Sequence, residues 1–193
     1  IWTARLTPEG AIVGEPVQIT DLPSSSLSRT IATAMTVDGS HFVLWEDATP
    51  GRPDLYAQLF TADQSRVGNN FLVNDDIVDA AQHFPDVVAL ANGDFYCVWQ
   101  DYRTEPVKVY SQRYDAALQP ILTNIPLISG QWEQRYPAIA SAGHAAHIAW
   151  QDARTPGQTH DIVARIESMT HDLSGQVSTL QSGVSVSGAD ITM

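Results

Sequence analysis

Three stretches decide the fold of this chain: Trp45-Glu46-Asp47, Trp99-Gln100-Asp101 and Trp150-Gln151-Asp152. Each of them ends an apolar run and is followed by the same kind of second segment. The return of one motif at a period of about fifty residues indicates a tandem repeat. A single repeat of this kind cannot bury its own faces, so the units must pack against one another.

Each unit opens with a polar residue pair, and a glycine turn follows some ten residues later. Gln82-His83-Phe84-Pro85 precedes Gly93, and Gln134-Arg135-Tyr136-Pro137 precedes Gly143. The first copy is the most diverged, with Ile31 at the position of the proline. Two β-rich runs separated by a glycine turn predict a hairpin.

Two further β-rich runs complete the unit. The third runs are residues 55–60, 109–114 and 162–166, and the fourth runs are predicted at 71–73, 126–128 and 177–180. Four antiparallel strands in about fifty residues are typical of the blade of a β-propeller, in which successive sheets pack face to face around a channel. Cover on both faces explains why the second run is apolar almost throughout. The fold class is therefore all-β and β-propeller-like.

The repeat also predicts how the chain is divided. Residues 22–75, 76–129 and 130–180 form three blades, while 1–21 form a half-blade and 181–193 a partial blade. In one arrangement the two terminal pieces pair as a composite blade, which removes exposed sheet edges. In the other, this is a piece of a larger ring completed by more of the chain or by another subunit. The start and stop within repeats favour a piece of a longer exported protein.

Composition excludes several classes of protein. The formal net charge of −12, with Lys108 as the single lysine, argues against a nucleic-acid groove, which needs a basic stripe. No apolar run of about twenty residues is present, so no membrane insertion is expected. Cys97 is the one cysteine and lies within a predicted strand, where we expect a small buried hydrophobic side chain.

The repeats resemble a known group of tandem repeats. Trp99-Gln100-Asp101-Tyr102-Arg103 and Trp150-Gln151-Asp152-Ala153-Arg154 match a W-Q-D-x-R pattern, and Asp54-Leu55-Tyr56-Ala57-Gln58 matches a D-I-Y-A-Q-R pattern. Both patterns are similar to repeats of bacterial secreted and cell-surface proteins with β-propeller-like folds. The resemblance implies a secreted, periplasmic or cell-surface location and a binding or scaffolding role.

The aspartate after each tryptophan is a tempting catalytic candidate. A catalytic acid and base need different environments, however, whereas Asp47, Asp101 and Asp152 occupy equivalent places. We therefore expect these side chains to accept hydrogen bonds from their own loops or to pair with arginine.

The loops between units hold the less regular residues. Asp75, Asp76 and Asp79 supply three carboxylates that would suit a calcium ion, because hard cations prefer oxygen ligands. The spacing of an EF-hand loop is missing, which favours a solvated acidic loop. Arg29, His83 and Arg135 begin the first runs at matched positions, where they either ring the channel mouth as an anion site or are solvated strand ends. Trp132 either stacks on a sugar or a partner side chain, or packs against the neighbouring unit.

The sequence supports two functions. The first is a non-catalytic interaction or scaffold module that binds protein or glycan on the loop face. The alternative is a propeller-type glycoside hydrolase or lyase, which needs unrepeated carboxylates that converge at the channel. Asp86 and Asp94 are unrepeated acids in a first hairpin. Fold class alone does not choose between these functions.

Overall fold

The computed structural model describes residues 1–21, 28–48, 51–154, 161–171 and 177–182. These residues contain fourteen strands in four antiparallel sheets, and no described helix is long and apolar enough to span a membrane. The strands are β1 Trp2–Leu6, β2 Ile12–Gln18, β3 Ser28–Met35, β4 His41–Asp47, β5 Asp54–Phe60, β6 Arg66–Leu72, β7 Gln82–Ala89, β8 Phe95–Asp101, β9 Lys108–Tyr114, β10 Pro120–Pro126, β11 Gln134–Ala142, β12 Ala145–Asp152, β13 Asp161–His171 and β14 Val177–Ser182.

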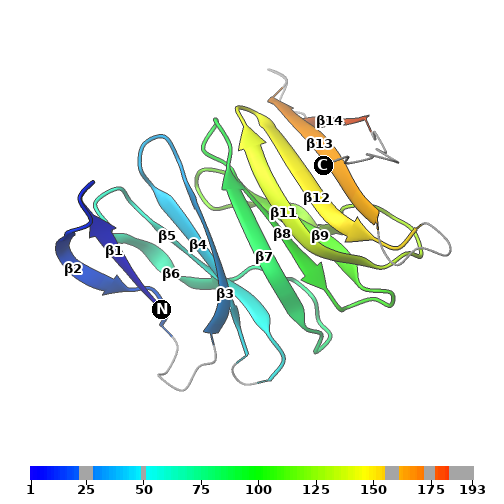
Figure 1. Ribbon diagram of the computed structural model, residues 1–193, viewed down its shortest axis with the longest axis horizontal. Helices are drawn as coiled ribbons and strands as arrows, with labels where there is room; N and C mark the ends of the chain where they lie inside the picture. Colours follow the sequence, from blue (N-terminus) through cyan, green and yellow to red (C-terminus); the bar gives the residue numbers. More distant parts are fainter. Residues whose placement is uncertain (22–27, 49–50, 155–160, 172–176, 183–193) are drawn as a thin grey trace, which may run out of the picture.

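Each four-stranded sheet is a simple meander of neighbouring strands: β3 to β6, β7 to β10 and β11 to β14. The sheets follow one another along the molecule, with the first strands β3, β7 and β11 in contact (Figure 1). The hairpin β1–β2 and the last strands β13 and β14 lie at opposite ends of the long axis. The described strands therefore form an open, β-propeller-like arc of sheets. The predicted pairing of residues 181–193 with 1–21 falls mainly outside the described residues.

Three hydrophobic clusters hold the arc together, one at each junction between sheets. The cluster between the first and second four-stranded sheets contains Phe42, Leu44, Phe95, Cys97 and Trp99. Cys97 is completely buried there, as predicted for a small hydrophobic side chain. A second cluster joins β8 to Ile148 and Trp150 of β12, and a third joins β4 to the β1–β2 hairpin.

Cover from neighbouring sheets decides which strands are apolar on both sides. Every residue of β8 is buried, because its sheet lies between two others. In β12, buried residues such as Ile148 alternate with residues that are only partly buried or, in the case of His147, exposed. Among the described residues, one face of that last sheet has no neighbour.

The outermost strands differ from the sequence prediction. The fourth strands were predicted at 71–73 and 126–128, but β6 and β10 begin earlier, at Arg66 and Pro120. The pattern was misleading because both strands carry polar residues and a register shift in their middle. At that shift, Asn70 and Asn124 donate hydrogen bonds to backbone carbonyls just after the preceding sheet, those of Ile19 and Val73.

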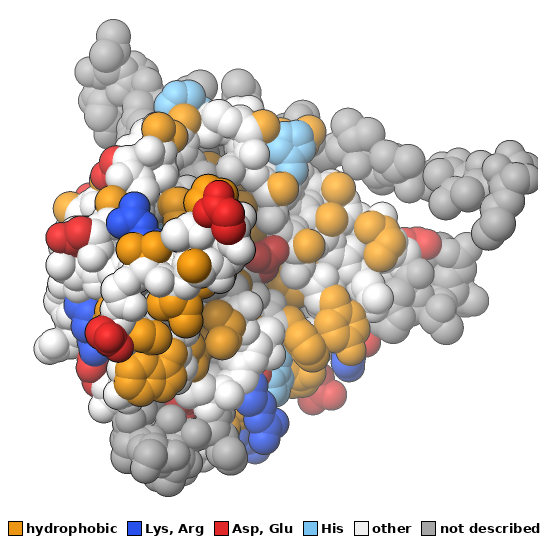
Figure 2. Space-filling model, turned by 60° about the vertical axis from the view of Figure 1, so that its left-hand side comes forward, with side chains coloured by type: hydrophobic (Ala, Val, Ile, Leu, Met, Phe, Trp, Pro, Cys, Tyr) orange, Lys and Arg blue, Asp and Glu red, His pale blue; other side chains and the backbone are white. Residues whose placement is uncertain are grey.

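The hairpin β1–β2 has an uncovered apolar surface. Trp2 is 64% exposed, Leu6 58% and Ile12 60%. Hydrophobic side chains gather on the side of the molecule where this hairpin lies (Figure 2). A two-stranded sheet has too few strands to cover these side chains by itself.

Candidate functional site

The first strand of each four-stranded sheet contains a bulge at a matched position. Thr30, Phe84 and Tyr136 have positive φ angles of 30°, 53° and 49°. The pairing with the second strand shifts register at each of these residues. A bulge redirects the side chain and strengthens the local twist. As a result, Phe84 and Tyr136 are turned to the surface, 39% and 47% exposed.

A side chain from the preceding sheet holds two of these bulges in place. The Glu46 Oε1 atom accepts a hydrogen bond of 2.7 Å from the backbone N–H of Phe84. The Gln100 Oε1 atom accepts one of 3.2 Å from the backbone N–H of Tyr136. The bulge leaves one backbone N–H without a partner in the neighbouring strand. Glu46 and Gln100, each directly after a tryptophan, supply the missing hydrogen-bond acceptor.

The bulges create an aromatic cluster, which we define as His83, Phe84, Tyr102 and Tyr136. The rings of Phe84 and Tyr136 meet edge to face with centroids 4.8 Å apart. His83 lies 5.9 Å from Phe84 and 5.6 Å from Tyr102, whose hydroxyl accepts a hydrogen bond from Gln100 Nε2. Two adjacent sheets thus contribute one continuous, partly exposed group of rings.

A buried carboxylate lies beneath this cluster. Glu46 is 3% exposed, and its Oε2 atom is 3.1 Å from His83 Nδ1. Burial raises the pKa of Glu46, but hydrogen bonds from His83 and the Phe84 amide outweigh that effect and leave the pKa below its usual value. Glu46 therefore stays ionised and fixes both the ring of His83 and the backbone of Phe84.

The three basic residues predicted at matched positions do occupy equivalent places. Arg29, His83 and Arg135 lie opposite the residue after the tryptophan, namely Glu46, Gln100 and Gln151. His83 belongs to the aromatic cluster, and Arg135 forms an ion pair with Glu133 beside it. Arg29 is exposed. The first strands that carry these residues, β3, β7 and β11, are in contact along the molecule. An anion site formed by the three residues stays a prediction.

Trp132 lies in the loop between β10 and β11 and is 44% exposed. Its ring packs so closely on Gly130 that a Cβ atom there would lie 2.7 Å from it, and the guanidinium of Arg154 lies 6.0 Å from its centroid. Among the described ring contacts, none joins Trp132 to the aromatic cluster. Packing within its own unit therefore accounts for part of the ring, while the remainder is accessible.

The three acidic residues predicted as a calcium site have partners within the protein, and Asp75 and Asp76 share one of them, Arg103. Asp75 accepts a hydrogen bond from the backbone N–H of Asn124 and pairs with Arg103. Asp76 accepts hydrogen bonds from Asn74 and Gln82. Asp79 is largely exposed, 3.9 Å from Arg52. In the described ranges, no three His, Cys, Asp or Glu side chains are arranged to hold a metal ion.

The repeated tryptophan–aspartate motif is structural in two copies. Asp101 accepts hydrogen bonds from Trp99 Nε1 at 2.8 Å and from Nε of Arg103. Asp152 accepts the same pair of bonds from Trp150 and Arg154. These are the loop and arginine contacts expected from the repetition.

The two unrepeated acids also have structural partners. The Asp86 Oδ2 atom accepts a hydrogen bond of 2.8 Å from the backbone N–H of Ile139 in the next sheet. Asp94 forms an ion pair with Arg113.

Asp54 has a raised pKa, chiefly because of burial. An aspartate, Asp161, recurs at the matched position of the third sheet, which favours a structural role for Asp54.

Sequence reasoning did not single out most of the aromatic cluster. A pattern in the sequence could have indicated Phe84 and Tyr136, because each of these aromatic residues directly precedes a proline at a matched position of its repeat. Neither the bulge nor the contact with Tyr102 follows from that pattern. Both depend on how consecutive sheets pack.

Comparison with known proteins gives similarity of fold only. No protein-family model matches this chain, and no curated protein sequence matches it. A family-43 glycoside hydrolase described as thermostable aligns with a TM-score of 0.55 and 11% identity, over 100% of this chain and 74% of that protein.

Two further solved structures come from Bacteroides thetaiotaomicron VPI-5482. An endo-arabinase aligns with a TM-score of 0.52 and 14% identity over 88% of this chain, and an endo-1,4-beta-xylanase with the same two values over 91%. The chain spans 65% of the length of each of these two proteins.

These comparisons correct the first functional expectation. We predicted a non-catalytic interaction or scaffold module, but the solved structures with a similar fold are titled as glycoside-cleaving enzymes. The titles of those structures agree better with the alternative expectation than with the first one. The sequence argument failed because repetition of the aspartates says only that those aspartates are structural, and nothing about the rest of the surface.

Proposed function

We propose that this chain is part of a carbohydrate-active propeller of the glycoside hydrolase or lyase type, and that it binds polysaccharide across the aromatic cluster. The observation that carries the proposal is the pair of exposed rings, Phe84 and Tyr136, held at fixed bulges beside His83 and Tyr102. The similar fold of an endo-arabinase and an endo-xylanase supports the choice of ligand class.

The cluster has the chemistry that a sugar ring requires. Aromatic faces cover the apolar C–H faces of a sugar, while phenol and imidazole groups exchange hydrogen bonds with its hydroxyls. The bulges that carry Phe84 and Tyr136 are fixed by Glu46 and Gln100. Binding therefore loses little conformational entropy, because the rings are already held in place.

The wider architecture belongs to the same proposal. The β1–β2 hairpin is the outer half of a blade whose inner strands come from elsewhere, which explains the exposure of Trp2 and Ile12. A secreted, periplasmic or cell-surface location fits a protein that meets polysaccharide outside the cell.

Isothermal titration calorimetry with soluble arabinan and xylan tests binding. We expect Phe84→Ala and Tyr136→Ala each to weaken binding to the better polysaccharide about tenfold, the effect of losing one well-packed aromatic contact of about 1.4 kcal/mol. Val37→Ala is the matched control, because Val37 is apolar and 99% exposed but lies outside the cluster. Equal affinity of the original chain and the three variants would show that the aromatic cluster is not the binding site.

A separate assay tests the reaction. Release of reducing sugar from the same polysaccharides indicates hydrolysis. A lyase is tested with a polysaccharide of uronic acids, such as polygalacturonate, because elimination needs the carboxylate at C5 and gives an unsaturated product that absorbs in the ultraviolet. Binding without either product would show that this chain supplies the carbohydrate-binding part of the propeller and not its reaction. Absence of binding to every polysaccharide tested would overturn the proposed function.

A further inference from the structure

Three residues at the aromatic cluster occur in one copy of the repeat only: Glu46, His83 and Tyr102. The other two copies have glutamine, arginine and alanine at the matched positions. The three residues come from β4, from β7 and from the loop after β8, yet they meet where the first and second four-stranded sheets join. Repetition of a residue favours a structural role, so departures that converge at one point favour a role of their own.

Glu46 fixes the position of the proton on the imidazole of His83. Its Oε1 atom accepts the backbone N–H of Phe84, and its Oε2 atom lies 3.1 Å from Nδ1 of His83. Burial acts to raise the pKa of Glu46, but these hydrogen bonds lower it below its usual value. An ionised carboxylate only accepts hydrogen bonds, so neutral His83 carries its proton on Nδ1 and a lone pair on Nε2.

The Nε2 atom of His83 is open to a ligand. The side chain of His83 is 28% exposed. Within the described part of the chain, Nε2 makes no hydrogen bond and is not among the polar atoms that are buried without a partner. An accessible ring nitrogen with a lone pair, held from behind by a buried carboxylate, has the arrangement of a general base.

Tyr102 supplies a hydroxyl beside this base. Its ring is 37% exposed and lies 5.6 Å from the ring of His83. Gln100 Nε2 donates a hydrogen bond of 2.7 Å to the hydroxyl oxygen, which leaves the hydroxyl proton for another acceptor. A base and a proton donor therefore lie next to each other on one exposed surface.

The carboxylates at the cluster do not suit glycoside hydrolysis. That reaction needs two carboxyl groups at the bond that is cleaved. Glu46 is 3% exposed and both of its oxygens are bound, and Glu133 beside the cluster pairs with Arg135. The cluster instead favours a reaction that uses an imidazole and a phenol.

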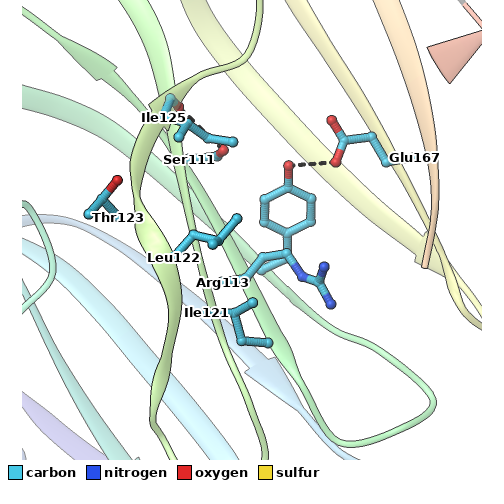
Figure 3. Close-up of a pocket in the computed structure, with 8 residues that line it drawn as sticks. Ser111, Arg113, Ile121, Leu122, Thr123, Ile125 and Glu167 are labelled. Carbon is cyan, nitrogen blue, oxygen red and sulfur yellow. Dashed lines mark hydrogen bonds between the residues drawn. The ribbon is translucent and has the colours of Figure 1, made fainter. Parts of the chain in front are cut away.

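Another place where the copies differ offers no such groups. A cavity of about 360 Å³, lined by Arg113 and Glu167 among others, lies between the second and third four-stranded sheets (Figure 3). There the hydroxyl of Tyr96 donates a hydrogen bond of 2.8 Å to Glu167, which also pairs with Arg165 at 2.9 Å. Tyr96 is 2% exposed and Glu167 6%, so these groups satisfy one another inside the protein.

We propose that His83 and Tyr102 are the catalytic base and acid of a lyase that cleaves a 1,4-linked polysaccharide of uronic acids, with Glu46 as the positioning residue of His83. The inference rests on the proposed function, because it takes the aromatic cluster as the polysaccharide site. It selects elimination from the two reaction types named there.

Two proton transfers balance the reaction. Nε2 of His83 takes the proton from C5 of the uronic acid, a double bond forms between C4 and C5, and the bond from C4 to the glycosidic oxygen breaks. The hydroxyl of Tyr102 gives its proton to that oxygen, which becomes the hydroxyl of a new chain end. Water then returns the proton from His83 to Tyr102. Arg135, 32% exposed beside the cluster, stabilises the negative charge that develops at the C5 carboxylate.

The contact between the two rings selects the configuration of the sugar. Because His83 and Tyr102 are in ring contact, they reach the sugar from the same side. The C5 hydrogen and the C4 oxygen lie on one face of the ring in mannuronic and glucuronic acid, and on opposite faces in galacturonic acid. Polymannuronate therefore fits this site better than polygalacturonate.

The ultraviolet absorbance of the unsaturated product tests the inference on the full chain. Polymannuronate and polygalacturonate are matched probes, because both carry one carboxylate on each sugar. We expect product from polymannuronate at a rate at least about tenfold higher, a difference of about 1.4 kcal/mol in the barrier. No product from polymannuronate, or faster release from polygalacturonate, would overturn the inference.

Two variants test the roles of the residues. Tyr102→Phe and Glu46→Gln should each lower kcat for polymannuronate about a hundredfold, the effect of losing one positioned acid or base. In Glu46→Gln the new amide donates to Nδ1 of His83, so the imidazole proton moves to Nε2 and blocks the base. KM should stay nearly unchanged, because glutamine holds the same bulge contact in the next copy. Val37→Ala, outside the cluster, is the control and should keep full activity.

Unchanged kcat in Tyr102→Phe or in Glu46→Gln would contradict the assigned roles. Calorimetry with polymannuronate separates this inference from the proposed function. Binding without unsaturated product would overturn the lyase and leave polysaccharide binding in place, whereas absence of binding to every polysaccharide would overturn both.

Discussion

At the scale of single residues, the repeated aspartates act as anchors for the loops that follow the second strands. Asp101 is completely buried and joins the indole of Trp99 to the guanidinium of Arg103. The same Arg103 reaches Asp75 and Asn124, so it links the loop to the segment that follows β6 and to β10. The diverged first copy has a different arrangement, in which Asp47 accepts a hydrogen bond from Ser28.

Asp101→Ala should lower the stability of the fold by about 3 kcal/mol, because it leaves the buried Arg103 charge and the Trp99 N–H without this partner. For a chain of this size that corresponds to a fall of about 6 to 12 °C in Tm. Differential scanning calorimetry checks the shift. Asp79→Ala is the control, since its exposed pair with Arg52 contributes about 0 to 1 kcal/mol. Similar shifts in both variants would contradict the anchor role.

Asp54 gives a prediction that depends on pH. Burial and the nearby Asp76, Asp79 and Asp47 charges raise its pKa in the folded chain. Because the folded state holds this proton more tightly than the unfolded state, the ionised carboxylate costs stability as pH rises from the usual value through the raised one. Asp54→Asn should therefore raise Tm by about 1 to 3 °C at pH 7.

The advantage of Asp54→Asn should disappear at about pH 3, where the carboxyl group is protonated in both states. Thermal denaturation followed by circular dichroism at the two pH values checks this. A gain in Tm that is the same at both values would show that the charge of Asp54 is not its cause.

At the scale of elements, consecutive sheets are joined by side chains at both their inner and outer strands. Glu46 and Gln100 hold the bulges of the next inner strand, as described above. On the outer strands, the Asn70 side chain accepts a hydrogen bond from the Asp21 backbone N–H at 2.6 Å, and Asn124 does the same for Asp75 at 2.7 Å. Each repeat therefore fixes the position of the next one.

Glu46→Ala should lower stability by about 1 to 3 kcal/mol, because the backbone N–H of Phe84 loses its acceptor. Glu46→Gln should cost less than about 1 kcal/mol, since Gln100 performs the same task in the next copy. Urea denaturation checks both values. If Glu46→Gln costs as much as Glu46→Ala, the charge paired with His83, and not the bulge contact, is what Glu46 contributes.

At the scale of the whole molecule, the charge is strongly unbalanced, with 22 acidic and 10 basic residues. Acidic groups lie near one another in the loop that follows β6, where they raise the pKa of Asp54. With a net charge of −12, the acidic side chains repel one another within the compact fold, which lowers the stability of the folded state.

Salt should therefore stabilise this protein. Raising sodium chloride from about 10 mM to about 150 mM shortens the Debye length from about 30 Å to about 8 Å and screens the repulsion. We expect Tm to rise by about 2 to 4 °C, equivalent to about 1 kcal/mol. Differential scanning fluorimetry checks the change. A fall in Tm would mean that the ion pairs of Arg103 and Arg154 outweigh the long-range repulsion.

The sequence by itself determined the repeat, the all-β class and the strands in the middle of each sheet. Those features are local: the tryptophan–aspartate motifs and the apolar second runs fix where β4, β8 and β12 lie. Only the tertiary structure decided the aromatic cluster and the cavity at Arg113, because each is built where two sheets meet. Groups far apart in the sequence come together there: Glu46 meets the backbone of Phe84, 38 residues later, and Tyr96 meets Glu167, 71 residues later. A pattern read along one repeat contains no information on how closely the next repeat packs.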